Sequence, residues 1–84
     1  TAMQIAGTAA LQLKNYDAAI NNFEGFLTAS PNARNADQIK YQLATAYEAK
    51  GDKANACVNY KAILNNPQFA EYAKHKINNE LKCQ

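Results

Sequence analysis

The feature that most constrains this 84-residue chain is that it matches itself when it is shifted by 37 positions. Small residues fall on small ones, as Ala19 falls on Ala56, and large rings fall on large rings, as Phe23 falls on Tyr60. Self-similarity at a fixed period of this size is the signature of supersecondary units stacked in tandem. The chain therefore contains two copies of one unit.

Each unit has the pattern of a helix pair joined by a short turn. Apolar residues recur every three or four positions, which is the helical period. Gly51 fits the left-handed position that ends a helix, and Asp52 fits the cap that begins the next one. Asn35 with Gln38 forms a candidate capping box, and Asn32 is the alternative cap. We expect helices at about residues 2–13, 16–28, from 32–35 to 50, 53–64 and 68–83.

The small residues at matching positions, such as Gly7 and Ala44, allow paired helices to approach closely, and large apolar residues fill the remaining space. The predicted fold is all-α: two antiparallel helix hairpins in an α-solenoid, at about 2–31 and 33–67, and a helix at about 68–83 that is a cap or, alternatively, the start of a third repeat. The predicted buried residues are Met3, Ala6, Ala10, Leu13, Ala19, Ile20, Phe23, Phe26, Leu27, Ile39, Leu43, Ala46, Tyr47, Ala56, Cys57, Tyr60, Ile63, Leu64, Phe69, Tyr72, Ala73, Ile77 and Leu81.

Composition excludes several classes. With 3 Gly and 2 Pro, the chain has too few turn residues for a sandwich or barrel of many short strands. A net charge of +2 without a concentrated basic stripe disfavours nucleic acid, and the basic residues near the C-terminus fit a solvated helix face better than a binding patch. No run of 18 apolar residues occurs, so we expect no membrane insertion. The absence of an initiator Met suggests a processed protein or a fragment.

At this point the pattern resembles the tetratricopeptide repeat (TPR) family over about residues 2–67. The resemblance implies a non-catalytic module that binds proteins or peptides. The longer join "PNARNADQIKY", followed by "YQLATAYEAKGD", is similar to TPR units of bacterial envelope proteins, such as the periplasmic coordinator of the Tol-Pal system. The residues that carry the family resemblance are Gly7, Tyr16, Ala19, Ile20, Phe23, Leu27, Pro31, Leu43, Ala44, Tyr47, Gly51, Asp52, Ala56, Tyr60, Leu64 and Pro67.

The resemblance also indicates where a partner binds, because the first helix of each pair lines the concave side of such a stack. Some TPR domains hold a terminal carboxylate there with Lys and Asn, but Gln4, Ile5 and Thr8 stand at these positions, so we expect no such clamp. Tyr41 and Tyr47 are the best aromatic candidates if they are not fully buried. The alternative is a solvated face or a face that packs on missing repeats, or a structural or self-associating segment without a separate ligand. The candidate binding residues are Gln4, Thr8, Gln38, Tyr41, Gln42, Thr45 and Glu48.

Candidate catalytic groups are few, and we predict neither an enzyme nor a cofactor. His75 lies between two lysines on an expected surface helix, without partners at metal-ligand spacing. Ser30 precedes a proline at a helix end, where a turn role is expected. Asp17 and Asp52 occupy turn positions, so paired-carboxylate chemistry is not indicated.

The two cysteines, Cys57 and Cys83, leave two possibilities open. The fourth and fifth helices run antiparallel, which brings the end of the chain towards the start of the fourth helix, although Cys83 overshoots it by about a turn. A disulfide would imply an oxidising compartment, hence a periplasmic or otherwise exported protein. Free thiols, with Cys57 as a small buried apolar residue, would be compatible with the cytoplasm.

Overall fold

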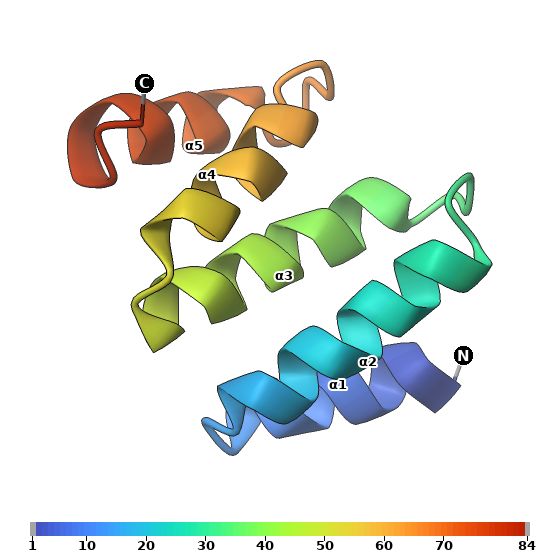
Figure 1. Cartoon of the computed structure of the whole chain (residues 1–84). Helices are drawn as coiled ribbons and strands as arrows, with labels where there is room; N and C mark the ends of the chain where they lie inside the picture. The colour runs from blue at the N-terminus through green and yellow to red at the C-terminus, as the bar shows by residue number, and fades with distance from the viewer. Residues whose placement is uncertain (1, 84) are drawn as a thin grey trace.

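The computed structural model describes residues 2–83, with side chains from residue 4 onward, and it is helical throughout its regular elements (Figure 1). The all-α helix-repeat fold is therefore confirmed. The elements are α1 (Ala2–Gln12), α2 (Tyr16–Ala29), α3 (Ala36–Lys50), α4 (Lys53–Ala62), α5 (Ala70–His75) and the π-helical turn η1 (Lys76–Glu80).

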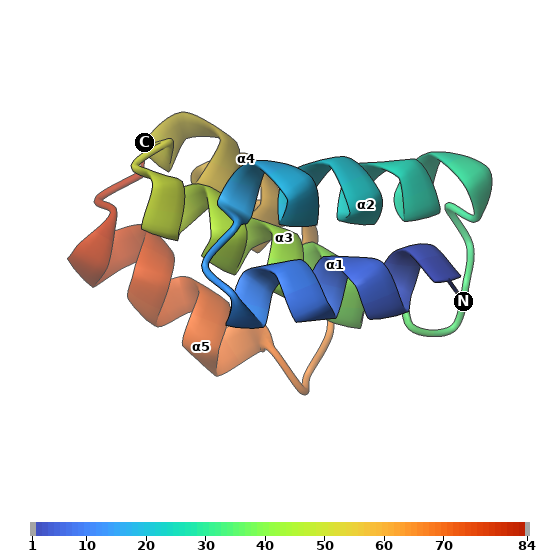
Figure 2. The ribbon, with the colours of Figure 1, turned by 90° about the horizontal axis from the view of Figure 1, so that it is seen from below.

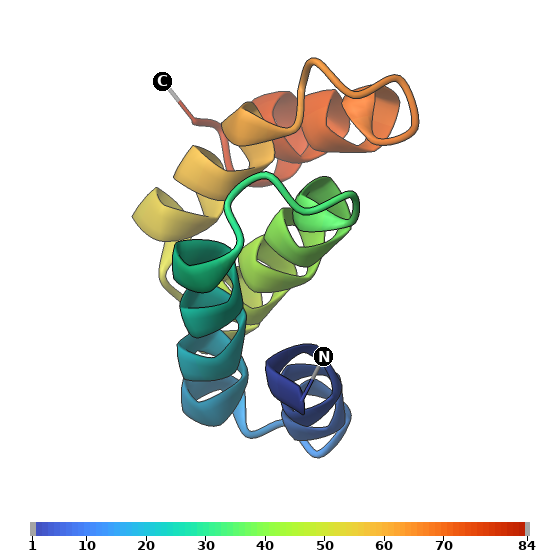
Figure 3. The ribbon, with the colours of Figure 1, turned by 90° about the vertical axis from the view of Figure 1, so that its right-hand side faces the viewer.

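The helices form two antiparallel hairpins, α1 with α2 and α3 with α4, and α2 packs on α3 to join them. Figure 3 shows the resulting stack: α1, α3 and α5 follow one another on one side, and α2 and α4 lie on the other. Figure 2 shows the hairpins from below, with α1 and α2 running side by side. This arrangement gives the molecule two distinct faces, one lined by the first helices of the hairpins and one by the second.

The turns inside the two hairpins have the same geometry. Lys14 and Gly51 both have positive φ, 62° and 99°, and the following amide donates to the carbonyl five residues earlier, at 2.8 Å from Asn15 and 2.9 Å from Asp52. The side chains of Asn15 and Asp52 then accept from the amide three residues later. Each turn thus ends one helix and caps the next with the same two positions.

A continuous apolar core runs through the stack. The largest fully buried side chains are Tyr60, Phe23, Ile39 and Ile63, and Phe23 and Tyr60 occupy matching positions in the two hairpins. Gly7 lies directly against the Phe23 ring, where an added Cβ would come within 2.6 Å of a ring carbon. The absence of a side chain at Gly7 therefore sets how closely α1 and α2 approach.

The start of the third helix differs from expectation. The capping box of Asn35 and Gln38 is not formed, and α3 begins at Ala36 without a side-chain cap. Instead, the Asn35 amide nitrogen donates to Oε1 of Gln4 at 2.8 Å. The Asn35 side chain thus ties the loop before α3 to α1, a tertiary contact that competes with local capping.

The first helix also buries less than predicted. Ala10 is buried, but Ala6 is exposed and Leu13 is 80% exposed; the side chain of Met3 lies outside the described residues. The reason is that α1 is at the end of the stack, so nothing in the described chain covers its outer side (Figure 3). The matching residue of Ala6 in α3, Leu43, is buried because α2 packs there.

The C-terminal segment is not the single helix predicted over 68–83. Helix α5 spans six residues and widens into η1. Tyr72, predicted to be buried, is 41% exposed. After η1 the chain reverses at Lys82 (φ 51°), which brings Cys83 to Cys57 with their Cα atoms 5.9 Å apart in a disulfide. Because of this reversal, Cys83 does not lie a turn beyond the start of α4, as was expected. Of the two alternatives for the cysteines, the structure shows the disulfide.

Candidate functional site

The seven predicted binding residues lie on the first helices of the two hairpins, and all seven are half-buried. We call this surface the concave face. Half-burial is intermediate between a core position and a freely solvated helix surface. The concave face comprises Gln4 and Thr8 from α1, and Gln38, Tyr41, Gln42, Thr45 and Glu48 from α3.

The two threonines of the concave face make the same local bond. Thr8 donates its hydroxyl to the carbonyl of Gln4 at 2.9 Å, and Thr45 donates to the carbonyl of Tyr41 at 3.0 Å. These bonds occupy the hydroxyl hydrogens and leave the hydroxyl oxygens as acceptors. The repeat therefore extends to side-chain hydrogen bonding, and the Thr45 hydroxyl also interacts with the hydroxyls of Tyr41 and Tyr60.

Gln38 and Gln42 are the polar groups on this face that remain available. They lie one turn apart on α3, and within the part of the chain that the structure describes neither side chain makes a hydrogen bond. Each amide can donate and accept at once. The pair can therefore recognise a ligand's peptide groups without any change in the protein's own bonds.

Beside them, Tyr41 forms an aromatic corner with the C-terminal segment. Its ring stacks on Phe69 at a centroid distance of 5.5 Å and meets Tyr72 edge-on at 5.2 Å. Burial, reinforced by the adjacent Tyr72, raises the pKa of Tyr41 above its usual range, so the hydroxyl stays protonated. The exposed ring of Tyr72 widens the concave face with an aromatic surface.

Glu48 connects three segments. One carboxylate oxygen accepts from the Tyr60 hydroxyl at 2.9 Å, and the other accepts from Lys76 Nζ at 3.0 Å. Burial by itself would lower the pKa of Lys76, but its bonds to Glu48 and Glu80 outweigh this effect and raise the pKa. With both oxygens occupied, Glu48 holds the C-terminal segment in place and offers little to a ligand.

Of the aromatic residues, Tyr47 is buried as the helical pattern predicted, which removes it as a binding candidate, and Tyr72 differs from its prediction. Tyr47 is only 8% exposed, and its hydroxyl donates to Glu24 of α2, so Tyr47 links the two hairpins and belongs to the core. Tyr72 was missed as a surface residue. An alignment of the last helix on α3 could have indicated this. If the two fully buried residues Ala73 and Ile39 are paired, Tyr72 falls on Gln38, which is outside the core.

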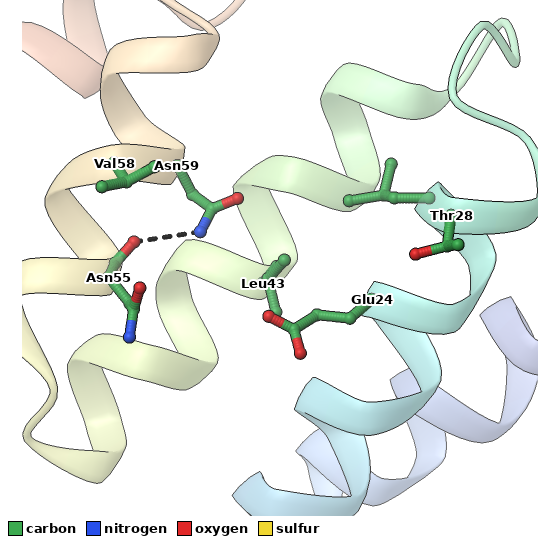
Figure 4. Close-up of a pocket in the computed structure, with 7 residues that line it drawn as sticks. Glu24, Thr28, Leu43, Asn55, Val58 and Asn59 are labelled. Carbon is green, nitrogen blue, oxygen red and sulfur yellow. Dashed lines mark hydrogen bonds between the residues drawn. The ribbon is translucent and has the colours of Figure 1, made fainter.

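A surface hollow lies on the opposite face, between α2 and α4 (Figure 4). It has a volume of about 460 Å³, with buried Leu43 at its floor and Val58, 63% exposed, on its wall. Asn59 donates to the carbonyl of Asn55 along its edge at 2.9 Å. We call it the α2–α4 groove. Sequence periodicity could not indicate it, because the groove exists only where α2 and α4 flank α3 in the stack.

Other kinds of site are not found in the described region. Between residues 2 and 83, no group of three His, Cys, Asp or Glu side chains could hold a metal ion. His75 faces Glu80, with Nε2 3.3 Å from the carboxylate, at the surface of the C-terminal segment. Among the described helices, none has the length and apolar character needed to cross a membrane.

Comparison with known families agrees with this geometry. Two models described as tetratricopeptide repeat match residues 1–33 and 39–68, which together cover most of the chain and correspond to the two hairpins. Neither a curated protein nor a solved structure matches the chain. Modules of this family generally mediate protein–protein interaction and are typically non-catalytic. With two matched repeats and the stacked hairpins that they describe, the chain belongs to the tetratricopeptide repeat family.

Proposed function

We propose that this domain is a non-catalytic interaction module that binds an extended peptide segment of a protein partner on the concave face. The observation that carries the proposal is the pair Gln38 and Gln42, half-buried and without hydrogen bonds of their own, on the same helix as Tyr41, whose ring meets Tyr72. A polar pair next to an aromatic surface is suited to a ligand that offers peptide groups and an apolar side chain.

The spacing of the two glutamines favours an extended ligand. Residues four apart on a helix are separated by about 6 Å along its axis. Alternate residues of an extended chain are separated by about 6.6 Å. A peptide lying along α3 would therefore present one peptide group to Gln38 and a second to Gln42. The concave face offers no unpaired charge to this ligand, because Glu48 is bonded to Lys76.

Selection and calorimetry can test this proposal. A displayed library of random peptides of about 12 residues, about 40 Å when extended, would be selected on the protein, and the enriched peptide would be titrated by calorimetry. The double variant Gln38→Ala, Gln42→Ala should raise Kd about 5- to 150-fold, since each lost hydrogen bond costs about 0.5–1.5 kcal/mol.

The matched control is Asn55→Ala, Asn59→Ala in the α2–α4 groove, which should leave Kd unchanged. If the control weakens binding and the glutamine variant does not, the ligand occupies the groove and the proposal fails. Failure to enrich any peptide would also contradict it. Tyr41 is unsuitable as the test position, because its ring packs on Phe69 and its removal would disturb the fold.

We further propose that the domain works in an oxidising compartment, as part of a bacterial cell-envelope protein in the periplasm. The support is the pairing of Cys57 with Cys83, since structural disulfides persist where thiols are not kept reduced. Protein recovered from its native compartment would be denatured without reductant and alkylated. No added label is expected on either cysteine, and labelling of both would refute this location.

A further inference from the structure

The α2–α4 groove differs from the concave face in the chemistry that it offers to a partner. Its volume of about 460 Å³ lies within the range of ordinary ligand pockets. Its apolar part is made by Leu43 at the floor and by Leu27 and Val58 on the walls. The lining comes from α2, α3 and α4 together, as Figure 4 shows, so the groove is formed by the stack and not by the face of one helix.

A carboxylate provides the charge of the groove. Among the seven lining residues of the described chain, Glu24 on α2 is the only ionisable one. One Glu24 oxygen accepts from the Tyr47 hydroxyl, which fixes the carboxylate beside the groove, and the other makes no bond within the described chain. Asp52 adds negative charge nearby, since burial, Glu24 and Asp52 together raise the pKa of Tyr47. Lys50, at the end of α3, is paired with Asp17 at 2.6 Å. The groove therefore has a negative field that no lining cation balances.

The uncharged polar groups of the groove also present acceptors. The side-chain nitrogen of Asn59 donates to the carbonyl of Asn55 at 2.9 Å, and that of Asn55 donates to Asp52 at 2.8 Å. Because both nitrogens are bonded along α4, the two side-chain oxygens are the groups without a partner in the described chain. In Figure 4 the Asn59 oxygen points towards α3, across the floor from Glu24. Free acceptors thus lie on both sides of an apolar floor.

We propose that the α2–α4 groove binds a protein partner through an arginine side chain inserted between α2 and α4. Arginine combines an apolar methylene stem with a planar, positively charged head that has several N–H donors and no acceptor. The stem matches the apolar floor and walls, and the head matches the free oxygens of Glu24 on one wall and Asn59 on the other. Lysine concentrates its charge on one strongly hydrated nitrogen, so it fits two separate walls less well.

The exposure of the lining residues sets the strength of this contact. Glu24, Asn55 and Val58 are exposed, so water and salt screen part of the attraction. A single arginine should therefore bind in the millimolar range, and its affinity should fall as the ionic strength rises. The groove shares no residue with the concave face, so this inference stands independently of the proposed function.

Nuclear magnetic resonance of the backbone amides would test the site with acetyl-arginine methylamide, whose blocked ends leave the guanidinium as its only charge. Shifts should concentrate on the residues of α2, α3 and α4 that surround the groove, and they should be absent from α1. Acetyl-citrulline methylamide, the neutral analogue with the same stem, should not bind. Equal binding of the two compounds, or shifts at an exposed carboxylate outside the groove such as Glu71, would overturn the proposal.

Two variants with matched controls identify the groups that bind. Glu24→Gln keeps an acceptor for the Tyr47 hydroxyl and should raise Kd about 5- to 10-fold, between the values for an exposed ion pair and for a hydrogen bond to a charged group. Its control is Glu71→Gln, which should leave Kd unchanged. Val58→Lys places a cation on the wall and should abolish binding, whereas Ile5→Lys, the same kind of change at an exposed site on α1, should not. Binding that survives both groove variants in helical, folded protein would refute the assigned site.

A blocked peptide with arginine between alanines distinguishes a protein partner from the free amino acid. It should bind at least as tightly as acetyl-arginine methylamide, and free arginine should bind less tightly, because its α-carboxylate adds a negative charge to a negative field. If free arginine binds and the peptide does not, the groove is a site for a small molecule and the proposal of a protein partner fails.

Discussion

Gly7→Ala gives the sharpest test of how the hairpins pack. A Cβ at position 7 would lie 2.6 and 2.8 Å from two carbons of the Phe23 ring. Unstrained carbon contacts are about 3.5–4.0 Å, so α1 and α2 must separate or the ring must move by roughly 1 Å. Phe23 is fully buried and has little room to move.

Two effects of opposite sign determine the result. Replacing a helical glycine by alanine stabilises a helix by about 1 kcal/mol. Overpacking a filled core costs about 1–3 kcal/mol. The net expectation is a loss of up to about 2 kcal/mol in the free energy of unfolding, with a central value near 1 kcal/mol. For a domain of this size that loss lowers Tm by about 4–8 °C.

Urea denaturation followed by circular dichroism would measure the change, with Phe23→Leu as a second background. If the ring is the obstacle, Gly7→Ala should destabilise the wild type and stabilise the Phe23→Leu protein by about the propensity gain of 1 kcal/mol. Ala44→Gly, the reciprocal change at the matching position, should also destabilise. A gain in stability from Gly7→Ala in the wild-type background would refute this account of the packing.

Three further predictions follow from the turns, the disulfide and the tyrosines. Lys14→Gly should raise the free energy of unfolding by about 0.5–1 kcal/mol, because Lys14 has the left-handed conformation that Gly51 adopts at the matching turn; unchanged urea denaturation would contradict this. Cys83→Ser should lower the free energy of unfolding by about 3.5 kcal/mol, since the bridge to Cys57 closes a loop with a sequence separation of 26. Equal stability of the reduced and the oxidised wild-type protein would contradict this prediction. Burial and the bond to Glu24 raise the pKa of Tyr47 from 10.0 to about 12. The unfolded chain therefore releases this proton first, and stability should fall as pH rises from about 10 to about 12. Tyr47→Phe should remove about 3 kcal/mol of that fall; an unchanged alkaline pH profile would refute the assignment.

Periodicity predicted the fold well because both repeats have small and large apolar residues at matching positions. Buried Phe23 and Tyr60 occupy matching positions, and the turns at Lys14 and Gly51 share one geometry. Such features are local or repeat at a fixed interval, and a single sequence displays both. The family models match the same two segments.

The concave face could be predicted only in part. Helical spacing identifies which residues leave the core, and it selected seven residues that the structure leaves half-buried. It could not show that Glu48 is occupied by Lys76, or that Tyr72 lies beside Tyr41, because both contacts depend on how the C-terminal segment crosses α3. The placement of that segment depends on the loop before α5 and on the disulfide from Cys83 to Cys57, which no periodic pattern indicates.

The hydrogen bond from Tyr47 to Glu24 has a consequence for the dynamics of the whole stack. It joins α3 to α2 across the boundary between the repeats, whereas the bond from Tyr60 to Glu48 lies inside the second hairpin. In a linear array, such boundary contacts decide whether neighbouring units open together or separately. A partner that immobilises α3 would therefore also slow hydrogen exchange in α2, which it never touches.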